Sequence, residues 1–278
     1  MEPSYIIKSS GERESWDPRK LERSLRAAKA DERLVQDIVA HVKRDAQDGM
    51  STHDIYTHAF ALLKRHSRPI AAQYSLKRAI TQLGPSGFPF ERFVAQILKA
   101  QGYHTKVGVM VRGVCVSHEV DVVAEKDDER ILVEAKFHNS PDVKSDVKVS
   151  LYVHARFQDI KKKLEEEEGG KRFNRAWLIT NTSFTTEAIK YGTCAGLALT
   201  GWNYPRGYTL QDIVQRTQTH PITCLTTLSN ANKDQLLNQG IVLCNDIIAN
   251  THILENIGMN RGRITATLNE IKNLYALD

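Results

Sequence analysis

Two apolar runs separated by a short polar turn constrain the fold of this chain more than any other feature. Residues 118–124 and residues 131–136 each read as a strand, because both are rich in valine, isoleucine and leucine. Residues 126–129, with the sequence Lys-Asp-Asp-Glu, read as a tight polar turn between them. The sequence therefore predicts a β-hairpin inside a larger, mostly buried sheet.

Charged residues within this hairpin give the first functional signal. Side chains alternate along a strand, so Glu134 and Lys136 lie on the same face. Hairpin pairing brings Asp121, near the middle of the first strand, close to both. Carboxylates suit Mg²⁺, a hard cation that takes oxygen ligands, and a lysine can orient an attacking water or stabilise charge on a phosphate. The pattern is typical of a metal-dependent nuclease site.

A plainer interpretation is an exposed pair of charges across two strands of a solvated sheet face. Against it, the flanking apolar runs are nearly continuous, as in strands buried on both faces. Charges in such strands are costly unless they are paired or bind a metal ion. We therefore prefer the metal-site interpretation.

The segments around the hairpin carry a family resemblance. Residues 88–98, followed by Gly102-Tyr103, look like an opening helix, and residues 177–188 look like a later strand, turn and helix. Together with the hairpin, they are similar to the PD-(D/E)xK nuclease superfamily, and more narrowly to the Mrr-type restriction endonuclease domain. The similarity runs over about residues 87–208.

This resemblance implies a catalytic set of Asp121, Glu134, Lys136 and Glu91. Asp121 and Glu134 would hold Mg²⁺ or Mn²⁺, with Glu91 helping to position it, and Lys136 would orient or activate the water. Many Mrr-type relatives have glutamine where this chain has Glu134, and a glutamate there strengthens the metal-ligand interpretation. The implied substrate is DNA.

The first eighty-odd residues form a separate signal. Residues 5–8 and 13–16 read as two short strands around a turn, and Asp17-Pro18 marks the start of a helix. Further helices are expected over about 32–48, from Ser51 onward, and over about 70–83, with residues 84–87 as a linker.

This hairpin with four helices, opening with Ile-Lys-x-x-Gly-x-x-Glu-x-x-Asp-x-x-Lys-Leu, resembles the ATP-cone, a small nucleotide-sensing domain. The resemblance implies that ATP or dATP binds as an effector and is not hydrolysed. It assigns nucleotide-binding roles to Lys8, Glu14, Asp17, Lys20 and Thr52. A folded but empty interaction domain is the alternative.

The remaining region, residues 209–278, is expected to be helical. Residues 225–229 and 233–241 look like two helices with Gly240 as a C-cap, and a last helix is expected over about 264–277. The region is faintly similar to helix–hairpin–helix modules that grip DNA. A packing or oligomerisation element is the stronger alternative.

Composition limits the class of protein. Net charge is +5, of which residues 1–84 carry +4, so the nuclease-like part is not conspicuously basic and DNA contact must depend on local patches or an oligomer. No apolar run is long enough for a membrane span and no signal peptide is evident. The four cysteines include no C-x-x-C, which predicts reduced, buried thiols in a cytoplasm. The resemblance to restriction endonucleases implies that this cytoplasm is prokaryotic.

The sequence thus predicts an α+β, multidomain protein: residues 1–84 an ATP-cone, residues 88–208 an α/β nuclease core with a central mixed sheet, and residues 209–278 a small helical region. The expected function is a restriction- or defence-type DNA endonuclease regulated by ATP or dATP. We expect a homo-oligomer, formed through the cone or the C-terminal helices. The alternative is a catalytically silent nucleic-acid-binding protein whose oligomeric state is switched by nucleotide, and an RNA substrate stays open.

Overall fold

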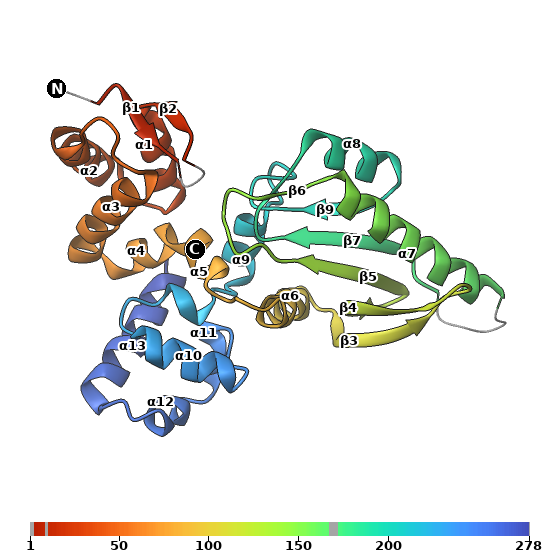
Figure 1. The fold of residues 1–278 in the computed structure, drawn as a ribbon. Helices are drawn as coiled ribbons and strands as arrows, with labels where there is room; N and C mark the ends of the chain where they lie inside the picture. Colours follow the sequence, from red (N-terminus) through yellow and green to blue (C-terminus); the bar gives the residue numbers. More distant parts are fainter. Residues whose placement is uncertain (1–2, 9–10, 167–171, 278) are drawn as a thin grey trace. The chain divides into compact units, whose positions relative to one another are not determined.

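The computed structural model describes residues 3–8, 11–166 and 172–277, which divide into two compact units (Figure 1). The first unit comprises Met1–Leu76, Cys224–Lys233 and Asn250–Asp278, and the second comprises Lys77–Thr223 and Asp234–Ala249. The chain therefore passes between the units at four points, one at each boundary of these segments.

The first unit begins with the predicted hairpin and four helices. Asp17 caps α1 by accepting the Arg19 backbone N–H at 3.1 Å, and Ser51 and Asp54 form a capping box at the start of α3. The elements are β1 (Tyr5–Ile7) paired antiparallel with β2 (Arg13–Ser15), α1 (Pro18–Ala27), α2 (Glu32–Asp45), α3 (Thr52–His66) and α4 (Arg68–Tyr74). Their apolar faces share one core that contains Leu25, Val35 and Leu63.

The fourth helix is shorter than the sequence suggested. The stretch expected as one helix over about 70–83 is two helices, α4 and α5 (Leu76–Thr81), separated at Ser75. The Ser75 hydroxyl donates to the Ala72 carbonyl at 2.9 Å, a local bond that competes with the helical pattern. The division between the two units falls directly after Leu76.

The first unit is completed by the C-terminal helices α12 (His252–Asn256) and α13 (Arg261–Tyr275). Helix α13 packs against α4. Its apolar stripe serves this packing within the chain, because Ile271 and Leu274 are fully buried.

A five-stranded mixed sheet forms the centre of the second unit. The strand order is β3-β4-β5-β7-β9, with antiparallel pairing from β3 to β5 and parallel pairing from β5 to β9. The strands are β3 (His104–Arg112), β4 (Ser117–Lys126), β5 (Glu129–Lys136), β7 (Arg175–Thr180) and β9 (Ala198–Thr200), with a small parallel pair of β6 (Lys144–Ser145) and β8 (Ser183–Phe184) beside them. This is the predicted α/β core with a central mixed sheet.

Helices cover the sheet of the second unit. Helix α7 (Val147–Glu166) and α8 (Thr186–Cys194) contribute Val153, Phe157 and Ala188 to a core with Val123, Leu132 and Leu178 of the sheet. Helix α6 (Phe88–Ala100) packs against β3, β4 and β5 through its buried residues, which are not part of that core. The rest of the unit includes α9 (Leu210–Thr217) and α11 (Cys244–Ala249).

The C-terminal region differs from the sequence expectation in one segment. Residues 225–229 are not helical: Ile222–Cys224 form one 3-10 turn, and the next α-helix is α10 (Asn230–Asn238). The backbone N–H groups of Thr226 and Thr227 donate to the buried Glu270 carboxylate instead, at 2.8 and 2.9 Å. Gly240, with φ +79°, ends α10 as predicted.

The cysteines and the membrane-span expectation are the remaining points. All four cysteines are free, but only Cys224 and Cys244 are buried, whereas Cys115 and Cys194 are exposed. Within the described part of the chain, none of the helices has the length and apolar character that a membrane span needs.

Candidate functional site

The pairing of β4 with β5 ends where the predicted site begins. The register runs up to the pair Val122↔Val133. At the next position the Asp121 carboxylate accepts a hydrogen bond from the Ala135 backbone N–H at 2.7 Å. A side chain has thus taken the place of a backbone partner, and this contact fixes the Asp121 carboxylate against β5.

Three carboxyl groups influence one another at this end of the sheet. Burial raises the pKa of Asp121 to about 7, and the charges of Glu134 and Glu91 act in the same direction. The Ala135 N–H and the positive charge of Arg156 oppose this rise. Sequence-predicted residues from β4, β5 and α6 therefore lie within electrostatic reach of each other, and such a perturbed carboxyl is typical of a functional site.

Glu91 lies in the first turn of α6 and interacts electrostatically with a fourth carboxyl group, that of Glu119. Burial raises the pKa of Glu91, and the charges of Glu119 and Glu134 add to the effect. Glu119 lies two residues before Asp121 on β4, and hence on the same face of the strand. Glu119 was not among the residues predicted from the sequence, because an exposed glutamate near the start of a strand gives no signal by itself.

Glu134 is buried and already has two donors. Its side chain accepts hydrogen bonds from the Tyr152 hydroxyl and from Arg156 Nη1, the latter at 2.6 Å. Tyr152 and Arg156 are four residues apart on α7, one helical turn, so they face the same way. Burial raises the pKa of the Tyr152 hydroxyl, which keeps it protonated as a donor. Sequence reasoning missed both residues, and the four-residue spacing was the only signal for them.

Lys136 is the last residue of β5, half-buried and paired with Thr180 of β7. Burial lowers the pKa of His138, and the nearby charge of Lys136 lowers it further. The backbone of His138 is held from both sides by the Asn181 side chain, at 2.8 Å each, and its ring is hydrogen-bonded to Ser145 at 2.9 Å. The segment that follows Lys136 is therefore anchored to the end of β7.

The carboxylates fit a hard cation by their chemistry. Asp121, Glu134 and Glu91 offer only oxygen ligands, which Mg²⁺ and Mn²⁺ prefer. The raised pKa of Asp121 indicates an excess of buried negative charge that a cation would compensate. Among the residues that the structure describes, however, these three do not form a group with ligand atoms all within 4.8 Å of one another. Water molecules would have to complete the coordination.

The residues predicted to bind nucleotide also lie near one another in the first unit. A hydrogen bond from the Lys20 ammonium lowers the pKa of Glu14, the charge of Lys8 acts in the same direction, and the charge of Asp17 opposes it. Residues 14–20 line an open hollow on the surface. Four of the five predicted residues are thus electrostatically linked.

The fifth residue, Thr52, is the first residue of α3. Ile7 of β1 forms a parallel bridge with Ser51, so Lys8 and Thr52 each follow one member of this bridge. Backbone N–H groups at a helix N-terminus favour anions such as phosphate. Thr52 therefore lies beside the end of β1, near the point where the chain continues into Lys8.

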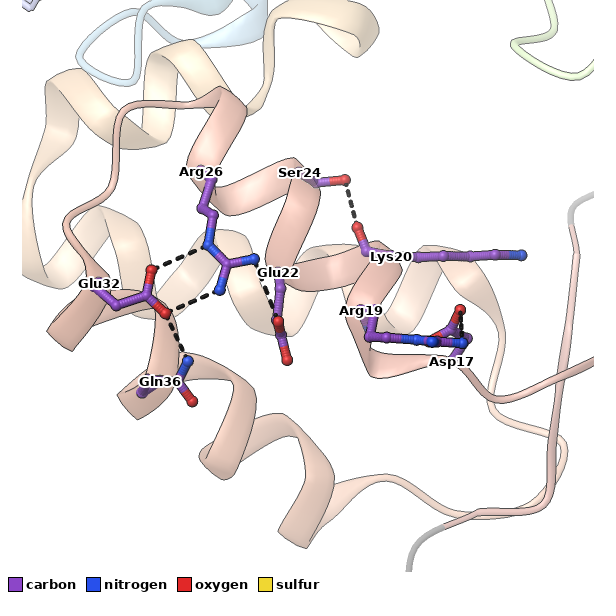
Figure 2. A network of polar contacts seen from close by, with 8 residues as sticks. All are labelled: Asp17, Arg19, Lys20, Glu22, Ser24, Arg26, Glu32 and Gln36. Carbon is purple, nitrogen blue, oxygen red and sulfur yellow. Dashed lines mark hydrogen bonds and ion pairs between the residues drawn. The ribbon is translucent and has the colours of Figure 1, made fainter.

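Figure 2 shows how the polar residues at the start of α1 are held. Arg19, which the sequence analysis did not single out, folds back on Asp17 with Nε 2.9 Å from the carboxylate. Further along the helix, the Arg26 guanidinium donates two hydrogen bonds, of 2.9 and 3.0 Å, to the Glu32 carboxylate. These bonds join α1 to α2. The hydrogen bond from Arg26 lowers the pKa of Glu32 to about 2.

Three family models match successive parts of the chain: an ATP cone domain over residues 4–83, a restriction endonuclease domain of the Mrr type over residues 84–201, and the C-terminal domain of AF1548-like proteins over residues 220–275. An uncharacterized protein of Archaeoglobus fulgidus is 37% identical over 182 residues, 65% of this chain and 99% of that protein. The chain belongs to the AF1548-like family.

The crystal structure of AF1548, a protein of unknown function, supports this membership. It is 36% identical, covers 69% of this chain and 100% of its own, and has a TM-score of 0.55. The MspJI restriction endonuclease in complex with a 27-mer oligonucleotide is 18% identical over 62% of this chain and 36% of that one, with a TM-score of only 0.35. The predicted order of an ATP-cone followed by an Mrr-type nuclease domain is confirmed for this AF1548-like protein.

Proposed function

We propose that this AF1548-like protein is a metal-dependent DNA endonuclease of the restriction or defence type, controlled by ATP or dATP bound at its cone. One observation supports the enzymatic part above the others. Asp121, Glu134 and Glu91 share electrostatic influence at the end of a buried sheet, and the pKa of Asp121 is raised to about 7. Arg156 pairs with Glu134, yet the pKa of Asp121 stays raised, which leaves negative charge for a metal ion to compensate.

Each side chain has a role in this proposal. Asp121 and Glu134 bind the metal ion, and Glu91 holds it or one of its waters from α6. Tyr152 and Arg156 orient the Glu134 carboxylate through the hydrogen bonds that they donate to it. A bound Mg²⁺ or Mn²⁺ would supply Lewis-acid polarisation of the phosphate and a water of lowered pKa. Lys136 orients the attacking water and stabilises the negative charge that develops on the phosphate.

The regulatory part rests on the cone and on helix α13. Lys8 and Lys20 would bind the phosphates of ATP or dATP, Thr52 would add its helix N-terminus, and Glu14 and Asp17 would accept hydrogen bonds from the ribose or base. Helix α4 of the cone packs against α13, and Glu270 of α13 binds residues Thr226 and Thr227. These contacts offer a route by which nucleotide binding alters the segment that leads into α10.

The test is a cleavage assay with the full chain on plasmid, linear and single-stranded DNA and on RNA. Each substrate is incubated with Mg²⁺ or Mn²⁺, with and without ATP and dATP. Asp121→Asn and Lys136→Ala are expected to lose cutting by about 100- to 1,000-fold, the range found when one group that stabilises transition-state charge is removed. Asp128→Asn, in the exposed turn of the same hairpin, and Lys272→Ala, on the surface of α13, are the matched controls.

The outcomes separate the hypotheses. Metal-dependent cutting that is lost in both site variants and changes with nucleotide supports the whole proposal. Undiminished cutting by both site variants would refute the site assignment. If no substrate is cut while nucleotide still changes the oligomeric state, the silent nucleic-acid-binding protein becomes the better description.

A further inference from the structure

Two histidines and an aspartate meet between neighbouring helices of the first unit, away from the residues discussed above. His41 and Asp45 lie four residues apart on α2, and His58 lies on α3, which packs against α2. In the described part of the chain, this is the one group of three histidine, cysteine or acidic residues whose ligand atoms all lie within 4.8 Å of one another.

The distances in this trio match those between ligands of one metal ion. His41 Nδ1 lies 3.3 Å from Asp45 Oδ2, and His58 Nε2 lies 3.6 Å from the same oxygen. Ligands about 2.0–2.1 Å from a tetrahedral ion are themselves roughly 3.4 Å apart. The two imidazole rings stand edge to face, with centroids 5.2 Å apart, so both can direct a nitrogen to a common point.

Hydrogen bonding does not account for the position of His41. Its Nδ1 atom is shielded from solvent, and no atom of the described residues gives it a hydrogen bond of acceptable geometry. The nearest carboxylate oxygen, of Asp45, is 3.3 Å away, and this contact does not have the geometry of a hydrogen bond. A buried ring nitrogen without a bond is costly, and a metal ion would satisfy its lone pair.

The surroundings of Asp45 agree with a ligand role. Its second oxygen, Oδ1, lies 3.5 Å from Arg44 Nε, an outer contact of the kind that orients a ligating carboxylate. The side chains of His58 and Asp45 are 24% and 41% exposed, so the trio is open to water on one side. A solvent molecule can therefore occupy a fourth position.

We propose that His41, Asp45 and His58 bind a divalent transition metal ion, Zn²⁺ by preference, with water as the fourth ligand. Two imidazole nitrogens and one carboxylate oxygen are a ligand set of zinc sites that keep an open position. Mg²⁺ and Ca²⁺ take oxygen ligands and are disfavoured here, so this site differs in chemistry from the carboxylates around Asp121.

A metal ion at this place would join the end of α2 to α3. These helices flank the loop of residues 46–51, which is bonded to β1 through Ile7 N–H to the Met50 carbonyl at 3.0 Å and Gly49 N–H to the Tyr5 carbonyl at 3.2 Å. The ion would brace this loop, and its removal would loosen the contact between the loop and β1.

Cobalt absorption tests the site directly. The full chain is stripped with a chelator and titrated with Co²⁺, whose visible bands report tetrahedral coordination by nitrogen and oxygen. We expect one equivalent to bind tightly, and affinity to fall about 10-fold or more in His58→Gln and in Asp45→Asn. His66→Gln removes an exposed histidine from the same helix and is the matched control. This control is expected to bind Co²⁺ like the unaltered chain, whereas Asp121→Asn identifies any Co²⁺ that binds at the carboxylates of the other site.

A second readout guards against misfolded variants. Zn²⁺ is expected to raise the melting temperature of the unaltered chain and of His66→Gln, but not that of His58→Gln, with circular dichroism as the check that each variant is folded. The proposal is overturned if His58→Gln and Asp45→Asn keep the Co²⁺ affinity of the unaltered chain, or if only Asp121→Asn loses it.

Discussion

Arg156 of α7 donates to the Glu134 carboxylate of β5 across 2.6 Å, and the two side chains are 22% and 9% exposed. The Tyr152 hydroxyl, one helical turn earlier, donates to the other oxygen of Glu134. The proposed metal ligand is therefore oriented by two side chains of α7, and the Arg156 guanidinium also pairs with its charge.

Replacing Arg156 by methionine should destabilise the chain mainly when metal is absent. Removing one partner of a buried ion pair leaves an uncompensated charge, so the free energy of unfolding should fall by about 3 kcal/mol in the presence of a chelator. With saturating Mg²⁺ the loss should be smaller, because the cation compensates Glu134. Urea denaturation in both conditions measures the two values. Lys162→Met, at an exposed position of α7, is the control. Equal losses with and without Mg²⁺ would argue against Glu134 as a ligand.

Lys20→Ala should weaken nucleotide binding at the cone. A hydrogen bond to a charged group contributes about 1.5–3 kcal/mol, so we expect the dissociation constant for ATP to rise about 10-fold or more. Lys64→Ala, an exposed lysine of α3, should leave it unchanged. Isothermal titration of ATP and dATP into the full chain gives the constants. Equal affinity in the Lys20 and Lys64 variants would remove Lys20 from the proposed site.

The burial of His220 predicts that the protein loses stability in mild acid. Burial lowers the pKa of this fully buried histidine to about 4, whereas an unfolded chain binds the proton near pH 6.5. The unfolded state then holds more protons between these values, so the free energy of unfolding should fall by on the order of 3 kcal/mol as pH drops from 6.5 to 4. Well above pH 6.5 neither state binds this proton, and the residue contributes no pH dependence.

Urea denaturation at a series of pH values tests this prediction. His220→Asn should flatten the profile between pH 6.5 and 4 relative to the unaltered chain. His104→Gln, which replaces an exposed histidine of β3, should leave the profile as it is. Parallel profiles for the His220 variant and the unaltered chain would contradict the assignment.

Glu270 should be a major source of stability in the first unit. It is 3% exposed and accepts hydrogen bonds from the Thr226 N–H, the Thr226 hydroxyl and the Thr227 N–H, at 2.6–2.9 Å. Glu270→Leu leaves these half-buried donors without their acceptor, and the free energy of unfolding should fall by about 3 kcal/mol. The exposed Glu255→Leu should change it by less than about 0.5 kcal/mol. Denaturation curves that coincide for the two variants would contradict this role.

Local pattern was enough to predict much of this protein. The apolar runs on either side of residues 126–129 specified the β4–β5 hairpin, and Asp17 and Ser51 marked helix starts that the structure confirms. Such signals act over a few residues, so a single sequence carries them. The family resemblance extended them to an ATP-cone and an Mrr-type nuclease domain, which the matches bear out.

Contacts between distant segments could not be predicted in the same way. Arg156 binds Glu134 only because α7 lies on the sheet with one particular rotation, which no local pattern fixes. Likewise, residues 225–229 resemble a helix, but Glu270, more than forty residues later, takes the N–H groups that a helix would use. The His58 partner of His41 and Asp45 depends on the packing of α2 against α3. In each case the deciding group is remote in the chain.

The chain crosses between its two units at four points, and this limits how the protein can be divided into fragments. A fragment that stops in the linker at residues 84–87 would lack α13 and would leave the covered side of α4 bare to solvent. Such a fragment is expected to associate or aggregate through that side, although its sequence spans the whole matched cone. Dissection of regulation from cleavage is therefore better done with point substitutions, and gene fusions that exchange the cone must carry the last helix with it.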